Sequence, residues 1–338
     1  MVPTLEKVSK AAGVSRSTVS RVINNHPNVS EATRARVQQA IKRCGYRPNG
    51  VARSLATSTT HILGMIIPEA VTKLFTDAYF PLMLRGATEA CNRRGYQLIL
   101  SLFTPSVDPH IMYDRVLRSG YLDGVVVANA SLDDRLIPTL LDEAIPFITI
   151  GRHPNDRVPY VDVDNIGGAR MATEHLIRLG HKRIAMITGP LDMTPSRDRL
   201  DGFREVMAAH HLPVDDWAVV EGDFMEAGGR AAMVHLLPEK PTAVFVGSDS
   251  MAIGAIKAIR DTGLRIPDDI CIVGFDDIPS AMTIEPELTT VRQPIERLGQ
   301  LVVEVLIERL ERGLKGATTV ERIVLPTELV VRRSCGAQ

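Results

Sequence analysis

The chain has 338 residues, of which 45% are hydrophobic and 23% are charged, an ordinary composition for a folded protein of two or three domains. No stretch approaches 18 consecutive apolar residues, and the first ten residues, which include Glu6, contain no apolar signal-peptide core. Its four cysteines are far apart and form no Cys-x-x-Cys or Cys/His cluster. We therefore expect a cytoplasmic protein with no membrane partner, no disulfide framework and no metal site.

Charge is divided unevenly along the chain. Residues 1–60 contain ten Lys/Arg and two Asp/Glu, a net charge of +8, whereas the other 278 residues contain 29 bases and 38 acids, a net charge of −9. The net charge of −1 for the whole chain hides this difference. A compact basic segment on an acidic body indicates nucleic-acid binding by that segment alone.

Three short helices are expected in the basic segment. They are predicted over 5–11, 16–24 and 31–43, with N-caps at Thr4, Ser15 and Ser30. Gly13 ends the first of these helices. Two short helices joined by one turn are typical of the helix-turn-helix motif, whose second helix contacts DNA.

The second predicted helix has one apolar and one polar face. Val19, Val22 and Ile23 gather on the apolar face. The polar face carries Arg16, Ser17, Ser20, Arg21 and Asn24. Arginine can pair with guanine, asparagine with adenine, and serine with a base or a phosphate. The solvated face of a small helical bundle would show the same pattern, so the pattern alone leaves both interpretations open.

A short segment over 47–60 follows these helices. Asn49, after the turn at Pro48, can cap a helix through Ala56 that is too short to be stable by itself. Its apolar residues, such as Val51 and Leu55, suggest that this helix forms only against another surface. The polar run over 57–60 reads as a linker.

Residues 4–56 resemble the headpiece of the LacI/GalR family of bacterial transcription regulators. The matching stretches are Ala-Gly-Val-Ser-x-x-Thr-Val-Ser-Arg-Val-Ile-Asn from Ala12 and Tyr-Arg-Pro-Asn-Gly-Val-Ala-Arg-Ser-Leu from Tyr46. The resemblance implies that the second helix reads bases in the major groove and that a hinge helix inserts Leu55 into the minor groove. The residues expected to contact DNA are Thr4, Ser15, Arg16, Ser17, Thr18, Ser20, Arg21, Asn24, Asn49, Ala52, Arg53 and Leu55.

Apolar strands alternate with amphipathic helices from His61 onward. Strands are expected at 62–67, 97–103, 124–128, 147–150, 183–188, 243–247 and 270–275. Helices are expected at 81–94, 168–179, 197–209, 251–262 and 295–312. This α/β alternation predicts doubly wound parallel sheets, and about 278 residues are enough for two lobes with a ligand cleft at the carboxyl ends of the strands.

No enzyme signature is found in this body. Gly-x-Gly-x-x-Gly, Gly-x-x-x-x-Gly-Lys-[Ser/Thr], Gly-x-Ser-x-Gly and His-Glu-x-x-His are all absent. Asp162 with Asp164, or Asp276 with Asp277, could form a carboxylate pair, but carboxylates at strand ends often cap polar groups instead. We expect no catalytic residue, no metal and no cofactor.

The body also resembles the LacI/GalR regulators, along its full length. The clearest matching stretches are 164–185, 199–203, 246–255 and 273–279. The resemblance implies a periplasmic-binding-protein-like core that dimerises and binds a small effector, usually a sugar, between its lobes. The expected division is a headpiece over 1–46, a hinge helix and linker over 47–60, and a core over 61–338, with lobes at about 61–162 plus 293–323 and 163–292 plus 324–338.

The resemblance also implies a set of effector-binding residues. Arg199 matches a guanidinium that binds sugar hydroxyls, Asp276 a carboxylate that accepts two of them, and Phe224 an aromatic ring that stacks on the sugar. The expected set is Tyr79, Phe80, Asn129, Arg152, Arg199, Phe224, Ser248, Asp276 and Gln293. Ser248 stands where the family commonly has asparagine. Arg152, with Arg197 and Arg199, leaves an acidic or phosphorylated effector as an alternative to a neutral sugar.

The leading functional hypothesis is a transcription regulator, a repressor that binds a pseudo-palindromic DNA operator as a homodimer and responds to the effector. A solute-binding protein for sugar transport is the alternative, and the basic headpiece argues against it. A sugar-processing enzyme is the third possibility, and the missing catalytic motifs argue against it.

Overall fold

The computed structural model describes residues 4–23, 26–46, 59–68, 71–102, 117, 120–128, 131–132, 136–313 and 320–337. The chain forms two compact units, Met1–His61 and Ile62–Gln338. Most of the expected hinge segment, residues 47–58, lies outside the described residues.

The described part of the first unit contains three helices: α1 (Leu5–Ala12), α2 (Arg16–Ile23) and α3 (Glu31–Cys44). The hydroxyl oxygens of Thr4, Ser15 and Ser30 accept the backbone N–H groups of residues three positions on, at 3.4, 3.1 and 3.4 Å. Valines and alanines of the three helices form the small buried core. The predicted helices and caps are therefore confirmed, with the ends of the helices shifted by one residue.

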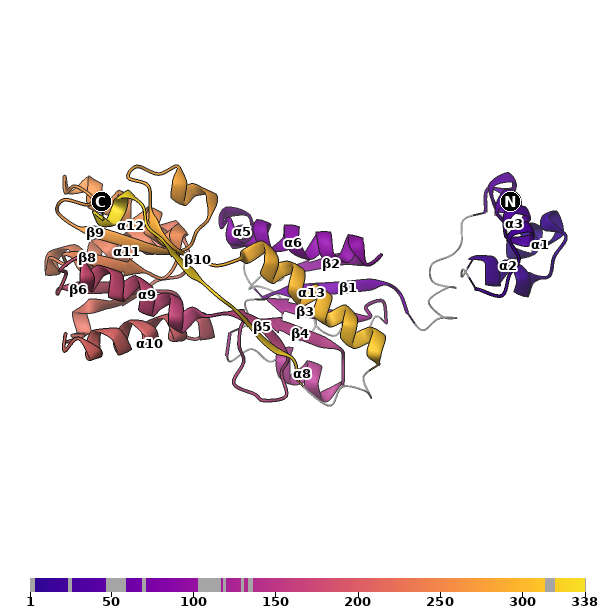
Figure 1. Ribbon diagram of the computed structural model, residues 1–338, viewed down its shortest axis with the longest axis horizontal. Helices are drawn as coiled ribbons and strands as arrows, with labels where there is room; N and C mark the ends of the chain where they lie inside the picture. The colour runs from indigo at the N-terminus through magenta and orange to yellow at the C-terminus, as the bar shows by residue number, and fades with distance from the viewer. Residues whose placement is uncertain are drawn as a thin grey trace. The chain divides into compact units, whose positions relative to one another are not determined.

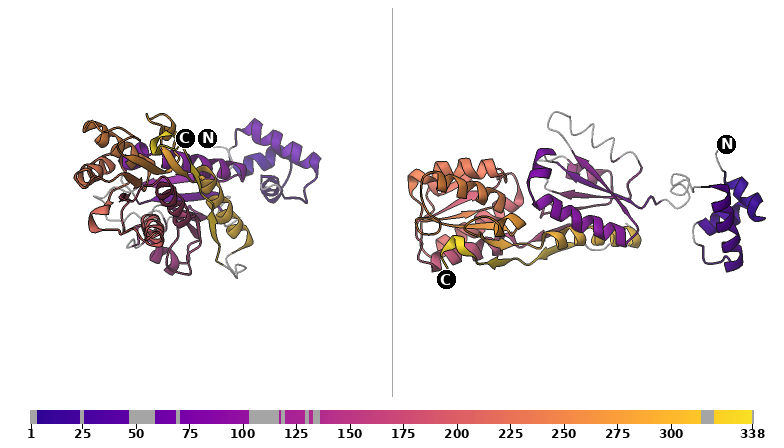
Figure 2. Two further views of the ribbon diagram at one scale, coloured as in Figure 1. Left: turned by 60° about the vertical axis from the view of Figure 1, so that its left-hand side comes forward. Right: turned by 90° about the horizontal axis from the view of Figure 1, so that it is seen from above.

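The first lobe of the second unit is built on a sheet of six strands in the order β11-β5-β4-β3-β1-β2, in which every pair is parallel. Its elements are β1 (Ile62–Ile67), α5 (Val71–Thr76), α6 (Tyr79–Arg93), β2 (Gln97–Leu102), β3 (Gly124–Ala128), α8 (Leu136–Asp142), β4 (Phe147–Ile150), β5 (Tyr160–Val163), α13 (Ile295–Arg312) and β11 (Arg322–Leu325). Alternate residues of β3 belong to two different apolar clusters, so both faces of the sheet are covered (Figure 2).

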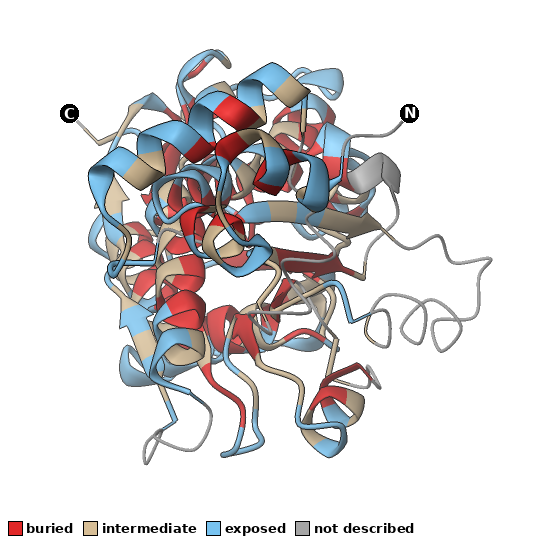
Figure 3. Ribbon diagram, turned by 90° about the vertical axis from the view of Figure 1, so that its right-hand side faces the viewer, coloured by how far each residue is buried: buried red, intermediate tan, exposed pale blue. Residues whose placement is uncertain are grey.

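The second lobe has a sheet of six strands in the order β12-β10-β9-β8-β6-β7, parallel except for β12 beside β10. Its strands are β6 (Ile184–Thr188), β7 (Val219–Glu221), β8 (Ala243–Val246), β9 (Cys271–Asp276), β10 (Thr289–Arg292) and β12 (Glu328–Val330). Its helices are α9 (Asn165–Arg178), α10 (Thr194–Ala209), α11 (Glu226–Leu236) and α12 (Asp249–Asp261), with 3₁₀ turns at η1 (Asp216–Ala218), η2 (Leu237–Glu239), η3 (Pro279–Met282) and η4 (Arg333–Cys335). Buried residues follow the strands and the inner faces of the helices (Figure 3).

Three connections join the two lobes. The chain passes from β5 to α9, returns from β10 to α13, and passes again from β11 to β12, the last as the yellow segment in Figure 1. The first lobe therefore extends to Val163 and Leu325, slightly beyond the expected 162 and 323. The architecture of a helical headpiece and two doubly wound lobes is confirmed.

Five strands were not predicted, namely β5, β7, β10, β11 and β12. They have three or four residues each and include polar side chains, so they lack the long apolar run that marks the other strands. Helices α6, α9, α10 and α12 begin two or three residues before their predicted starts. Their first turns carry residues such as Thr194 and Asp249, which interrupt the apolar periodicity.

Two glycines allow α6 and α13 to approach closely. A Cβ added at Gly86 would lie 2.0 Å from the carbonyl oxygen of Glu296, and one at Gly299 would lie 2.1 Å from that of Met83. Both clashes are with backbone atoms of the facing helix, so only a separation of the helices could relieve them.

We therefore expect Gly299→Ala to lower the free energy of unfolding by about 1–3 kcal/mol, because overpacking outweighs the better helix propensity of alanine. Urea unfolding followed by circular dichroism measures this change. Glu308→Ala on the same helix, which removes an exposed ion pair with Arg312 at 3.0 Å, should change stability by less than about 0.5 kcal/mol. Equal stability of the two variants would contradict the close helix contact.

Candidate functional site

Helix α2 presents a polar surface in the first unit. Val19 and Val22 are buried, whereas Arg16, Ser17 and Arg21 are exposed. Thr18 and Ser20 are half-buried, and Ser15, which caps the helix, is exposed. The predicted residues Asn24, Asn49, Ala52, Arg53 and Leu55 lie outside the described residues.

The hydroxyl groups at the start of α2 are hydrogen-bonded to one another. The Oγ of Ser15 lies 2.7 Å from that of Ser17 and 2.9 Å from the Oγ1 of Thr18. This network fixes the first turn of the helix, while Arg16 and Arg21 extend from its exposed side. Two arginines and several hydroxyls on one short exposed helix can bind phosphates and base edges.

A pocket of about 1000 Å³, counted with the solvent at its mouth, lies between the two lobes of the second unit. Residues at the carboxyl ends of β4 and β5 line it on the first lobe, and Ser248 after β8 and Asp276 at the end of β9 line it on the second. The lining residues most relevant to binding are Asp77, Tyr79, Phe80, Arg152, His153, Asp162, Asn165, Arg199, Phe224, Ser248, Asp276 and Gln293.

The structure brings eight of the nine predicted effector residues to this pocket: Tyr79, Phe80, Arg152, Arg199, Phe224, Ser248, Asp276 and Gln293. The ninth, Asn129, lies outside the described residues. Arg197 does not line the pocket and instead donates to the carbonyl oxygen of Leu191 at 2.5 Å. The effector-binding roles of these nine residues stay predictions.

Arg199, on α10, is the buried cation of the pocket. Its Nε donates to the Oδ1 of Asn165 at 2.9 Å, and its Nη1 donates to the carbonyl oxygen of Gly247. Its guanidinium carbon lies 3.7 Å from the centre of the Phe275 ring, and Nη1 lies 3.8 Å from the Oδ1 of Asp276. Burial lowers the pKa of Arg199, and the Asp276 carboxylate opposes this shift.

Asp276 ends β9 and points its carboxylate toward the same place. It is buried, accepts a hydrogen bond from the Nε2 of Gln293, and has a φ of 120°, outside the usual range for a residue with a side chain. Burial raises the pKa of Asp276 to about 7, with Asp77 adding to the shift and Arg199 opposing it. A carboxylate with this pKa can change its charge near neutral pH.

Arg152 joins the two lobes across the pocket. It follows β4 in the first lobe, and its Nε and Nη2 both donate to the carboxylate of Asp198 on α10 of the second lobe. Its backbone N–H donates to the Oδ2 of Asp162 at 2.9 Å. The Asp198 carboxylate raises the pKa of Arg152, which keeps the guanidinium charged.

Aromatic side chains supply the apolar part of the pocket. Tyr79 and Phe80 pack edge to face with ring centres 5.6 Å apart. Phe224 has a left-handed φ of 66°, and its ring lies where a Cβ added at Gly189 would be 2.1 Å away. Burial, with the nearby Asp276 carboxylate, raises the pKa of Tyr79, so its hydroxyl stays protonated and can donate a hydrogen bond.

Several pocket residues were not predicted as binding residues. Asp162 was considered only as half of a carboxylate pair with Asp164, whose side chain instead caps α9 by accepting the Gly167 N–H at 2.8 Å. Asp77 was not singled out in the sequence, and Asn165 lies in the family-matching stretch 164–185 but was not expected to bind the effector. No group of three or more His, Cys, Asp or Glu within the described part of the chain is arranged to hold a metal ion.

The fold and the pocket define a class of protein: a helix-turn-helix module joined to a two-lobed core that binds a small molecule between its sheets. Residues 4–49 match the model described as "Bacterial regulatory proteins, lacI family", and residues 173–335 match "Periplasmic binding protein-like domain". None of the helices described is long and apolar enough to cross a membrane.

Full-length relatives agree with this class. The chain is 42% identical over 339 residues to the HTH-type transcriptional regulator CelR of Thermobifida fusca, with 98% of each chain covered. It resembles the structure of a CelR–cellobiose complex at 38% identity, a TM-score of 0.76 and coverage of 98% and 99%. It also resembles the lac repressor dimer bound to operator and the anti-inducer ONPF at 29% identity, a TM-score of 0.86 and full coverage of both chains. The chain belongs to the lacI family of bacterial regulatory proteins.

Proposed function

We propose that this regulator is a repressor that binds a pseudo-palindromic DNA operator as a homodimer, through α2, and that a neutral sugar in the interlobe pocket changes its operator affinity. The family and the relatives named as transcription regulators support the DNA-binding part of the proposal. The exposed arginines Arg16 and Arg21 on a short helix support the choice of α2.

The observation that carries the sugar proposal is the pairing of charges in the pocket. Arg152 is neutralised by Asp198, and Arg199 lies beside Asp276. Among the residues that the structure describes, three carboxylates (Asp77, Asp162 and Asp276) and two guanidinium groups line the pocket, so a phosphorylated or acidic ligand would meet a surplus of negative charge from them. Carboxylates and guanidinium groups beside aromatic rings suit the hydroxyls and apolar face of a neutral sugar.

Cellobiose is the first compound to test, since the similar structure of CelR is a complex with cellobiose. We infer that the pocket binds its ligand without catalysing a reaction and needs no cofactor, because the relatives are named as regulators. The two carboxylate pairs considered above also do not converge: Asp164 caps α9, away from Asp162, and Asp277 binds Arg332, away from Asp276. We further propose a cytoplasmic location, where bacterial DNA is accessible.

Selection of genomic fragments by the purified protein, with and without a panel of neutral sugars and sugar phosphates, tests this function. We expect enrichment of one palindromic sequence, and we expect cellobiose or another neutral sugar to weaken or strengthen the binding of the protein to it. Failure to enrich any sequence at low salt, where phosphate contacts are strongest, would favour the solute-binding alternative. A response to sugar phosphates alone would contradict the charge argument.

The role of α2 is tested by Arg21→Ala. We expect operator affinity to fall by roughly 1–3 kcal/mol and discrimination to relax at one base position, because an arginine that pairs with guanine is lost. Binding to a library of single-base operator variants measures both effects. Arg36→Ala, an equal charge change at an exposed position of α3, should weaken binding to all sequences alike. An unchanged base preference in Arg21→Ala would contradict the assignment.

The role of Asp276 predicts a pH dependence of sugar affinity. Sugar hydroxyls donate to the ionised carboxylate, whose pKa is raised to about 7, so protons compete with the sugar below that pH. Affinity should be constant above pH 8 and fall by roughly tenfold per pH unit below about 7. Calorimetry between pH 5.5 and 8.5 measures this profile.

Two variants identify the group whose titration causes the pH dependence. Asp276→Asn should bind the sugar weakly at every pH while it keeps operator affinity. His153→Gln should retain the step near pH 7, because burial lowers the pKa of His153 and the imidazole is already neutral there. A constant sugar affinity across this pH range in the unmodified protein would show that sugar binding does not depend on an ionised Asp276.

A further inference from the structure

The turn that follows β9 contacts three different parts of the second unit. Asp276 lines the pocket, Asp277 points away from it, and the side chain of Ile278 is buried in the apolar cluster of the first lobe. Asp276 and Asp277 have φ values of 120° and 58°, so two consecutive residues adopt positive φ values, which are uncommon for residues other than glycine. Such a turn persists only where its surroundings hold it.

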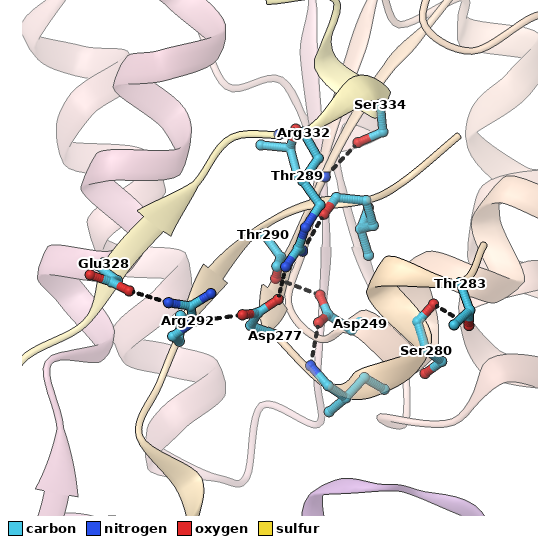
Figure 4. Close-up of polar contacts among 12 residues, drawn as sticks. Asp249, Asp277, Ser280, Thr283, Thr289, Thr290, Arg292, Glu328, Arg332 and Ser334 are labelled. Carbon is cyan, nitrogen blue, oxygen red and sulfur yellow. Dashed lines mark hydrogen bonds and ion pairs between the residues drawn. The ribbon is translucent and has the colours of Figure 1, made fainter. Parts of the chain in front are cut away.

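Asp277 is held by two arginines. Its Oδ2 accepts a hydrogen bond from the Nε of Arg292 at 2.6 Å, and its Oδ1 accepts one from the Nη2 of Arg332 at 2.6 Å (Figure 4). Arg292 also donates to Glu328 through Nη1 at 2.6 Å. The side chains of Asp277 and Arg332 are 7% and 9% exposed, whereas that of Glu328 is 64% exposed, so the network runs from the interior to the surface.

These partners lie on the segments that connect the lobes. Arg292 is the last residue of β10 and precedes by three residues the start of α13 in the first lobe. Glu328 is the first residue of β12, which follows β11 of the first lobe after two residues, and Arg332 follows β12. The carboxylate next to the pocket residue Asp276 thus joins two of the three connections between the lobes.

A second buried carboxylate holds the other side of the turn. Asp249, at the start of α12, accepts the backbone N–H of Ile278 at 3.0 Å and the hydroxyl of Thr290 on β10 at 2.6 Å (Figure 4). Arg332 adds a hydrogen bond to the carbonyl oxygen of Leu288 at 2.8 Å. The turn is therefore fixed to β10 from both sides, and it cannot shift without moving the start of a lobe connection.

We propose that Asp277 is a positioning residue that couples the effector pocket to the lobe connections, by holding Asp276 in its binding position through Arg292 and Arg332. This inference rests on the proposed function, because it assumes that Asp276 contacts the effector. A sugar that changes the position of Asp276 must also change the position of Asp277, its neighbour in the constrained turn. Arg292 and Arg332 then pass that change to the segments that set the angle between the lobes.

Asp277→Asn is the informative variant. Asparagine tolerates the left-handed conformation as well as aspartate does and keeps the shape of the side chain, so the variant removes the charge and leaves the turn allowed. Glu328→Gln is the matched control, since it makes the same carboxylate-to-amide change at the exposed end of the same network.

The first arm of the experiment uses no ligand. Hydrogen–deuterium exchange is measured over 274–293 and 326–333 in the full-length protein. We expect Asp277→Asn to exchange at least fivefold faster in both segments and Glu328→Gln to match the unmodified protein. Unchanged exchange in Asp277→Asn would overturn the proposal, whatever the sugar does.

The second arm measures cellobiose affinity and the ratio of operator affinities with and without cellobiose. We expect Asp277→Asn to bind cellobiose at least tenfold more weakly and to lose most of the operator response, while its operator affinity without sugar stays within about twofold. A full operator response in Asp277→Asn at saturating sugar would overturn the proposal. If the unmodified protein does not bind cellobiose, that part of the proposed function fails, and the exchange arm still decides the role of Asp277.

A double variant separates positioning from simple neutralisation of a buried charge. Asp277→Asn leaves the guanidinium of Arg332 buried beside a neutral side chain, and adding Arg332→Gln removes that charge. We expect the double variant to regain thermal stability without regaining the operator response. Recovery of both would show that Asp277 only neutralises Arg332, and the positioning role would be wrong.

Discussion

Burial of charge at the carboxyl ends of the strands is the constraint on which the rest of the core depends. A guanidinium such as that of Arg199 loses its hydration when it is buried and needs charged or polar partners in return. Asp276, Asn165 and the carbonyl oxygen of Gly247 provide them, and each comes from a strand end or from the helix that follows a strand. The parallel sheets bring these ends together, so the fold gathers these charged and polar groups at the pocket.

The same constraint explains why strained backbone is tolerated there. Asp276, Asp277 and Phe224 all have positive φ values, which cost on the order of 1–3 kcal/mol each. Hydrogen bonds from Gln293, Arg292 and Arg332 hold the two aspartates in place. A strained backbone conformation persists only when neighbouring residues hold it. The residues that hold Asp276 and Asp277 belong to the segments that join the lobes. Ligand contact and lobe geometry are therefore linked by construction.

Much of this arrangement could be predicted from sequence, and the limits have physical causes. The strands at 62–67, 124–128 and 147–150 were predicted with correct ends, because they are buried on both faces and form continuous apolar runs. Arg152 was placed in the pocket by the family resemblance, but its partner Asp198 was not, since the two residues are 46 positions apart and meet only when the lobes are assembled. Without that partner, Arg152, with Arg197 and Arg199, left an acidic or phosphorylated ligand as an alternative to a neutral sugar. The structure pairs the first with a carboxylate and directs the second to a backbone carbonyl.

The pairing of arginines also explains how an acidic core can carry many bases without competing for DNA. Between residues 152 and 204, Arg152, Arg170, Arg178 and Arg183 each form an ion pair with a carboxylate of the second lobe. Paired charges of opposite sign produce only a weak field beyond about 8–10 Å at physiological salt, so these arginines attract phosphates little. In residues 1–60, by contrast, ten bases face only two acids. Long-range attraction to DNA is thereby confined to the unit that carries α2.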